Sequence, residues 1–247
     1  MNGKRIAWWV GMLAALASPA TAADATLQAD VFSAYVWRGI TLNADPVFQP
    51  TLDVALPKGF GLTVWGNMDL GDNNGKLEAG EFSETDFTIS YGYSVGALSL
   101  TAGCIEYLYP HQTNEVGALH GTRDVYGGLD FDLGLGFAAS AYLYYDVEEV
   151  KDLYANAGVS YSYTCPANVT TEVGASVGYA GKDWAVYNSH GTAGGFHEYT
   201  VTLAARYPIT DAMELGAQIA YTGSLDEDVL PDQETHLYGG GTLGYTF

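Results

Sequence analysis

The sequence predicts an all-β fold: a transmembrane antiparallel up-and-down β-barrel of about 12 strands, preceded by a cleaved signal peptide. Three observations predict it. An export signal opens the chain, apolar residues then alternate at period two in runs of about ten, and aromatic residues crowd the ends of those runs. The chain has 247 residues, 48% hydrophobic and 15% charged, and this composition excludes a disordered protein.

The first segment directs export and is not part of the fold. The positive stretch Met1–Arg5 precedes the apolar run Ile6–Ala17, and Ala20–Ala22 is a cleavage signal of the A-x-A type. The run is too short to cross a bilayer, which takes roughly 20 apolar residues; the alternative is a buried N-terminal helix. We expect residues 1–22 to be a signal peptide and residues 23–247 to form the barrel of an exported Gram-negative protein.

Period-two alternation defines the strands. In the longest apolar file, every second position holds Leu135, Phe137, Ala139, Ala141, Leu143 and Tyr145. Short connections alternate strictly with long ones, as in an up-and-down meander that has short turns at one end and long loops at the other. We therefore expect both termini and the short turns in the periplasm and the long loops outside. The predicted strands are residues 27–38, 48–56, 60–70, 85–94, 97–108, 123–132, 135–146, 153–163, 170–180, 197–207, 213–222 and 235–247.

The aromatic residues decide between a soluble sandwich or barrel and a membrane barrel. A soluble core gains nothing from large rings at its margins, whereas amphipathic rings sit well at the two boundaries between water and lipid. We therefore expect the apolar files to contact outer-membrane lipid. The rings near strand ends on these files are Tyr35, Trp37, Phe60, Tyr91, Tyr93, Phe137, Tyr145, Tyr161, Tyr163, Tyr179, Tyr199, Tyr207, Tyr221 and Tyr245.

The last residue and the charge balance indicate the partners. The chain ends on Phe247, and a terminal aromatic resembles the signal by which the barrel-assembly machinery recognises Gram-negative outer-membrane barrels. With 9 Lys+Arg against 29 Asp+Glu the formal net charge is −20. Nucleic acid is excluded as a partner, because phosphates are bound by clustered Lys and Arg. A basic patch for an anionic lipid surface is excluded for the same reason; small solutes remain.

The first predicted strands carry a family resemblance. The segments Ser33–Gly39, Pro46–Pro50 and Trp65–Asn67 include an S-x-Y-x-x-R-G motif formed by Ser33, Tyr35, Arg38 and Gly39. This pattern, mainly over residues 30–94, resembles a bacterial exported family labelled Gcw_chp. The resemblance implies an outer-membrane barrel and carries no biochemical activity with it.

Motifs for catalysis or metal binding are sparse, so we expect no catalytic residue, no metal site and no cofactor. No His-x-His or Glu-x-x-His spacing supports a metal site, and the adjacent pair Ser189 and His190 does not suit a nucleophile and its base. The segment Gly71–Gly75 fails the EF-hand pattern, because Leu70 would take the first ligand position. A loosely held calcium in this acidic loop remains an alternative. The histidines expected in solvated outer loops are His111, His120, His190, His197 and His236.

The cysteines and one glycine run have structural interpretations. Cys104 is expected in mid-strand and Cys165 in a short turn, too far apart for a disulfide, so two thiols are expected; a disulfide is the alternative in an oxidising compartment. Gly239–Gly241 lacks the strand–turn–helix setting of a phosphate site and indicates bends or tight strand contacts.

The inward file is the candidate site, because its ionisable residues would line a pore. Glu172, Arg206 and Glu214 fall at matching heights on consecutive strands and could form a ladder that braces the interior. Acids without such partners would make the lumen prefer cations. The pore-lining candidates are Asp30, Arg38, Asp53, Asp69, Asp86, Asp124, Asp130, Glu172, Glu198, Arg206 and Glu214.

Three functions from different classes remain open. The first is a small passive channel, porin-like, with an acidic and cation-preferring lumen. The second is a non-conducting structural or surface-contact barrel with a plugged lumen, whose acidic outer loops bind a partner or divalent ions. Loop 181–196, with Trp184 and Tyr187, would then carry the contact. The third is an outer-membrane hydrolase. A clear path or a plug inside the barrel would discriminate between the first two.

Overall fold

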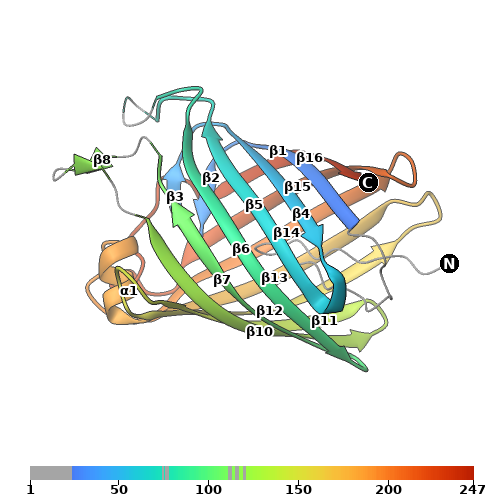
Figure 1. Ribbon diagram of the computed structural model, residues 1–247. Helices are drawn as coiled ribbons and strands as arrows, with labels where there is room; N and C mark the ends of the chain where they lie inside the picture. The colour runs from blue at the N-terminus through green and yellow to red at the C-terminus, as the bar shows by residue number, and fades with distance from the viewer. Residues whose placement is uncertain (1–23, 74, 76–77, 111–112, 115–116, 119–120) are drawn as a thin grey trace.

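Twelve long strands close into one barrel in the computed structural model (Figure 1). The structure describes residues 24–247 except 74, 76–77, 111–112, 115–116 and 119–120. The barrel strands are β1 (Asp24–Phe32), β4 (Val47–Ala55), β5 (Phe60–Asp69), β6 (Phe82–Val95), β7 (Leu98–Leu108), β10 (Thr122–Gly134), β11 (Phe137–Asp146), β12 (Leu153–Thr164), β13 (Thr170–Ala180), β14 (Gly195–Pro208), β15 (Met213–Ser224) and β16 (Leu237–Thr246).

Each barrel strand pairs antiparallel with the next one along the chain, and β1 closes the ring against β16. The closing register runs from Thr26 opposite Thr246 to Phe32 opposite Gly240. At Gly240 the strands are tightly apposed, because a Cβ there would fall 2.2 Å from the Val31 carbonyl oxygen. This confirms the expected tight contact in the glycine run, and closure pairs the backbone groups that an open sheet edge would leave free.

The connections divide the barrel into two ends. The short turns, among them the 3-10 turn η1 (Pro57–Gly59), lie at what we call the short-turn end, on the right of Figure 1 with the C-terminus. The opposite, long-loop end carries the minor elements. They are β2 (Tyr35–Trp37), β3 (Ile40–Asn43), β8 (Thr113–Asn114), β9 (Gly117–Ala118) and α1 (Lys182–Asn188). In the described part of the chain, no helix has the length and apolar character to cross a bilayer.

The outward files of the strands are apolar and exposed. At mid-strand, the side chains of Ile89 and Val159 are 53% and 59% exposed. Exposed rings lie toward both ends, with Tyr163 and Tyr245 near the short turns and Tyr145 and Tyr221 near the long loops. A continuous apolar belt of this kind with aromatic margins is the surface of a barrel of the outer-membrane type, because water would penalise so much exposed apolar area.

All twelve predicted strands are present, and eleven of them match the observed bounds to within three residues at each end. The first is the exception: it was expected over residues 27–38, but β1 ends at Phe32 and the chain leaves the wall there. The expected signal peptide, residues 1–22, lies outside the described residues.

Candidate functional site: the barrel interior

The interior is lined by the polar file that alternates with the apolar one. Ten of the eleven predicted pore-lining residues lie on barrel strands at positions opposite in phase to the exposed apolar residues, so they face inward. Toward the short-turn end are Asp53, Asp130, Glu172, Arg206 and Glu214; toward the long-loop end are Asp30, Asp69, Asp86, Asp124 and Glu198. Arg38 is also inside, but it arrives there on a loop.

The segment 33–46 folds into the barrel as a hairpin made of β2 and β3, which we call the lumen hairpin. It departs from the wall at Ser33, whose N–H donates to the Gly239 carbonyl at 2.9 Å. Tyr35 is 7% exposed, and its hydroxyl donates to Glu84 at 2.9 Å. The prediction that Tyr35 and Trp37 face lipid is therefore wrong. Their alternation continues through the break, so periodicity alone could not show that the chain turns inward.

Arg38, at the tip of the lumen hairpin, reaches the far wall. Its Nη2 lies 3.0 Å from Asp124 Oδ2 on β10, and the two side chains are 3% and 4% exposed. The same nitrogen lies 3.4 Å from the Tyr107 hydroxyl on β7. Since β10 stands five strands away from β1 around the ring of twelve, the hairpin spans the lumen.

Aromatic rings surround the Arg38 guanidinium. Its Cζ lies 4.3 Å from the ring centroid of Tyr144 on β11 and 4.5 Å from that of Tyr154 on β12. The Trp37 ring of the hairpin is also at 4.5 Å, and the Trp184 ring of α1 is at 5.6 Å. Ring faces attract a cation, more strongly where water is excluded. The rings and the carboxylate of Asp124 together stabilise a buried charge that would otherwise be costly.

Gly39 places the turn against β14. Its φ is +82°, and a Cβ there would lie 2.8 Å from the Glu198 Cβ and 3.1 Å from Leu230 Cδ2. Glu198 accepts hydrogen bonds from the Tyr154 hydroxyl and pairs with His197 Nδ1 at 2.7 Å. His197 is fully buried on this strand, so the prediction of a solvated loop histidine is wrong for it. Arg38 and Gly39 of the motif can therefore pack against the barrel wall: the arginine has binding partners there, and the glycine has no side chain that would clash with Glu198.

An apolar and aromatic core fills this half of the interior. Trp184 is 2% exposed and its ring packs against that of Tyr154 with a centroid distance of 5.0 Å, while Val229 and Leu230 of the last long loop are completely buried. These residues form one cluster with Ile40 of the hairpin. Within loop 181–196, which would carry the contact of a surface-contact barrel, Trp184 faces the interior and Tyr187 on the same helix is 50% exposed, so Tyr187 is the aromatic ring available to a partner.

A polar network fastens the base of the lumen hairpin to the wall. Asn43 Nδ2 donates to Asp69 Oδ1 at 2.6 Å, and Asn67 donates to the same oxygen at 3.0 Å. Gln49 in turn donates to Asn67 Oδ1 at 2.9 Å. Asp69 is 1% exposed. It faces inward as expected, but its contacts make it an anchor of the hairpin.

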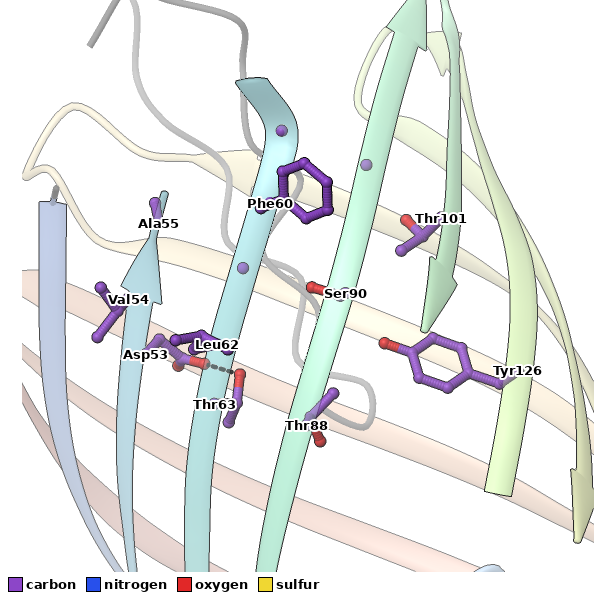
Figure 2. A pocket seen from close by; sticks show the side chains of 13 residues that line it. Asp53, Val54, Ala55, Phe60, Leu62, Thr63, Thr88, Ser90, Thr101 and Tyr126 are labelled. Carbon is purple, nitrogen blue, oxygen red and sulfur yellow. Dashed lines mark hydrogen bonds between the residues drawn. The ribbon is translucent and has the colours of Figure 1, made fainter. Parts of the chain in front are cut away.

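The half near the short turns is lined by small hydroxyl side chains. Figure 2 shows a row of them on consecutive strands, in a cavity of about 40 Å³, where the Thr63 hydroxyl donates to Asp53. Asp53 and Asp130 are partly exposed here, unlike the buried acids of the other half. The small hydroxyl side chains around this cavity are Thr63, Thr88, Ser90 and Thr101, and the larger Tyr126 also lines it.

The predicted ladder of Glu172, Arg206 and Glu214 is present on β13, β14 and β15, although it is staggered. Arg206 stands directly opposite Thr170 and Gly216, and each acid is one inward step away along its strand. Its guanidinium interacts electrostatically with both carboxylates. The three residues therefore brace the interior diagonally at the short-turn end.

Two buried inward acids, Glu84 and Asp146, were not among the predicted pore-lining residues. Glu84 is 3% exposed and accepts a hydrogen bond from the Tyr35 hydroxyl. The sequence did not place it on a strand, because that strand was expected to begin at residue 85. A register shift opposite Asn67 lets β6 start earlier. Asp146 ends β11 and accepts backbone N–H groups from Glu148 to Lys151, so it caps a loop. The sequence signal that could have identified Asp146 is its position, which alternates with the outward apolar residues of β11.

The described residues show little catalytic or metal chemistry. None of them forms a group of three or more His, Cys, Asp or Glu suited to a metal ion. Ser189 Oγ lies 2.8 Å from the carbonyl oxygens of Ala185 and Val229, which ties it to the helix end. Cys104 and Cys165 are free thiols. His111 and His120 lie outside the described residues.

Comparison with known proteins identifies a family and a fold. A family model described as "Bacterial protein of unknown function (Gcw_chp)" matches residues 16–235. No curated protein sequence matches the chain.

Among solved structures, the "KdgM porin in complex with disordered oligogalacturonate" is similar at a TM-score of 0.57 and 9% identity, over 91% of this chain and 99% of that one. The "COG4313 outer membrane channel from Pseudomonas putida F1" gives 0.56 at 12% identity, over 94% and 97%. A Salmonella typhi outer membrane phospholipase dimer with bound calcium gives 0.50 at 10% identity, over 89% and 90%. Channels and an enzyme thus share this barrel architecture, and the likeness shows the fold alone.

Proposed function

The chain belongs to the family described as bacterial protein of unknown function, Gcw_chp, and from that premise we propose that it is a small passive channel of the outer membrane with an acidic, cation-preferring interior. The observation that carries the proposal is the charge of the partly exposed interior near the short turns. Among the predicted pore-lining residues of that half, four carboxylates face one guanidinium, Arg206. Carboxylates around a narrow passage concentrate negative potential and favour cations.

The contrast with a structurally similar porin supports this preference. Oligogalacturonate, which is bound in the KdgM complex, is a polyanion, and an interior with an excess of carboxylates would repel such a solute. We propose that both termini face the periplasm, because β1 begins and β16 ends at the short-turn end. We also propose that the barrel-assembly machinery recognises Phe247, which follows β16 and packs against the exposed ring of Tyr245.

The test is ion selectivity in planar bilayers. Under a salt gradient, the wild-type reversal potential should indicate cation preference, and the triple variant D53N/D130N/E172Q should bring it toward zero. A matched control removes three exposed acids outside the barrel wall, D72N/E227Q/E234Q, and should leave the reversal potential nearly unchanged. Equal selectivity in all three proteins, or anion preference in the wild type, would contradict the proposal.

A second function is favoured by a different observation. The packed cluster around Trp184 and Leu230, together with the lumen hairpin, occupies the half near the long loops, which supports a non-conducting structural or surface-contact barrel. Flat current traces from preparations that migrate as folded barrels would favour this alternative. Steps that appear only when the hairpin is released would favour a channel that the hairpin closes.

A further inference from the structure

The site that holds Arg38 is built mainly by the barrel wall, not by the hairpin that carries the arginine. Of the four rings around the guanidinium, only Trp37 belongs to the hairpin. We define the cation cage as the remaining residues that approach Arg38, all from other elements: Tyr107, Asp124, Tyr144, Tyr154 and Trp184.

The cage residues are held in place independently of Arg38. The Tyr154 and Trp184 rings pack in a tilted arrangement with centroids 5.0 Å apart, and the Tyr154 hydroxyl also donates to Glu198 on β14. Tyr144 packs 6.3 Å from Tyr154 on the adjacent strand, and the Tyr107 hydroxyl donates to Asp124 at 3.2 Å. Movement of the hairpin would thus leave the Asp124 carboxylate with aromatic faces around it, contributed by the wall and by α1.

That combination recognises a particular chemistry. Ring faces attract a polarisable cation, and a planar guanidinium also stacks on them while its N–H groups bind a carboxylate. A small hydrated ion such as K⁺ would lose its water shell among the rings without regaining as many ligands. We propose that the cation cage is a binding site for small organic cations of the guanidinium or alkylammonium class, and that Arg38 is a ligand which the chain supplies to itself.

In this arrangement the lumen hairpin and a dissolved cation compete for one site. The hairpin has the advantage of being tethered, and its tip is also positioned by Gly39 against Glu198. An external ligand should therefore bind weakly to the wild type and more tightly once the Arg38 side chain is removed. The proposal concerns binding and does not depend on whether the barrel conducts.

The experiment measures binding of methylguanidinium chloride to purified folded barrel, by tryptophan fluorescence and by the shift in thermal unfolding. R38A should bind it at least about tenfold more tightly than the wild type, and KCl at equal ionic strength should have no such effect. R123A removes an arginine one position from Asp124 on the outward face, and it should behave like the wild type. R38A/D124N should lose the gain.

Two results would overturn the proposal. One is an R38A barrel that folds and binds methylguanidinium no better than the wild type; the other is a gain that survives in R38A/D124N. If R38A does not fold, its refolding yield becomes the measurement. Yield should then recover with millimolar methylguanidinium and not with sodium chloride, and a failure to recover would equally reject the site. R38K, which keeps a tethered cation, should remain closer to the wild type than R38A in both measurements.

Discussion

Arg38 and Asp124 are separated by 86 positions in the chain and meet at 3.0 Å inside the barrel, with side chains 3% and 4% exposed. One residue comes from a hairpin that leaves the wall after β1, and the other from β10, five strands away around the ring. The ion pair therefore ties the lumen hairpin across the interior. It also makes the conformation of residues 33–46 depend on closure of the whole barrel.

Removal of the acid should be costly. D124N should lower the free energy of unfolding by about 3–5 kcal/mol, because it leaves Arg38 buried without its ionic partner. Urea titration in detergent micelles, followed by heat-dependent electrophoretic mobility, measures the loss. The double variant R38M/D124L removes both charges and should regain most of it. A D124N barrel as stable as the wild type would show that the pair does not stabilise the closed arrangement.

The turn at Gly39 should not tolerate a side chain. G39A must adopt φ near +82° and also place a Cβ 2.8 Å from Glu198. G80A is the control, because Gly80 has φ of +89° at the same end of the barrel with no atom within 4 Å of its Cβ position. Both variants carry the backbone cost, so G39A should be less stable than G80A by a further ~1–3 kcal/mol. Equal melting temperatures would argue against a tightly seated hairpin.

Barrel closure should depend on one glycine of the run in β16. A Cβ on Gly240 would fall 2.2 Å from the Val31 carbonyl oxygen, whereas at Gly241 the nearest atom is 3.7 Å away. We expect G240A to lower stability by about 1–3 kcal/mol and to reduce the folded yield, while G241A stays close to wild type. Folding into lipid vesicles, scored by gel mobility, separates the two. The reverse order would mean that the closing register is different.

The two faces of β12 should respond oppositely to charge. Val159 is 59% exposed on the outward file, and the next residue, Ser160, lies on the inward file. In lipid vesicles V159K should cost about 2–4 kcal/mol, since it puts an ammonium near the bilayer midplane, and S160K should cost much less. The measurement is urea unfolding of both variants in the same vesicles. A harmless V159K would indicate that the outward file meets water.

The twelve strands and the direction in which their side chains face were predictable from the sequence. A strand between lipid and a polar interior alternates its residue types at every step, so the outward direction of Phe137, Leu143 and Tyr145 and the inward direction of the acids can be inferred from the local sequence. Aromatic residues at the margins identify lipid as the outer solvent. The inward direction of Asp53 and Glu172 also follows from the sequence, because each lies next to an outward apolar residue of its own strand.

The lumen hairpin and the cation cage were decided by tertiary structure alone. Tyr35 and Trp37 continue the odd-numbered apolar file of β1, so the alternation runs past Phe32 and does not show that the chain leaves the wall there. The meeting of Arg38 with Asp124, and of Gly39 with Glu198, requires opposite walls to be brought to a fixed separation. Only closure of all twelve strands sets that separation. The sequence alone therefore specifies which solvent each face meets, while the closed ring determines which residues meet across the interior.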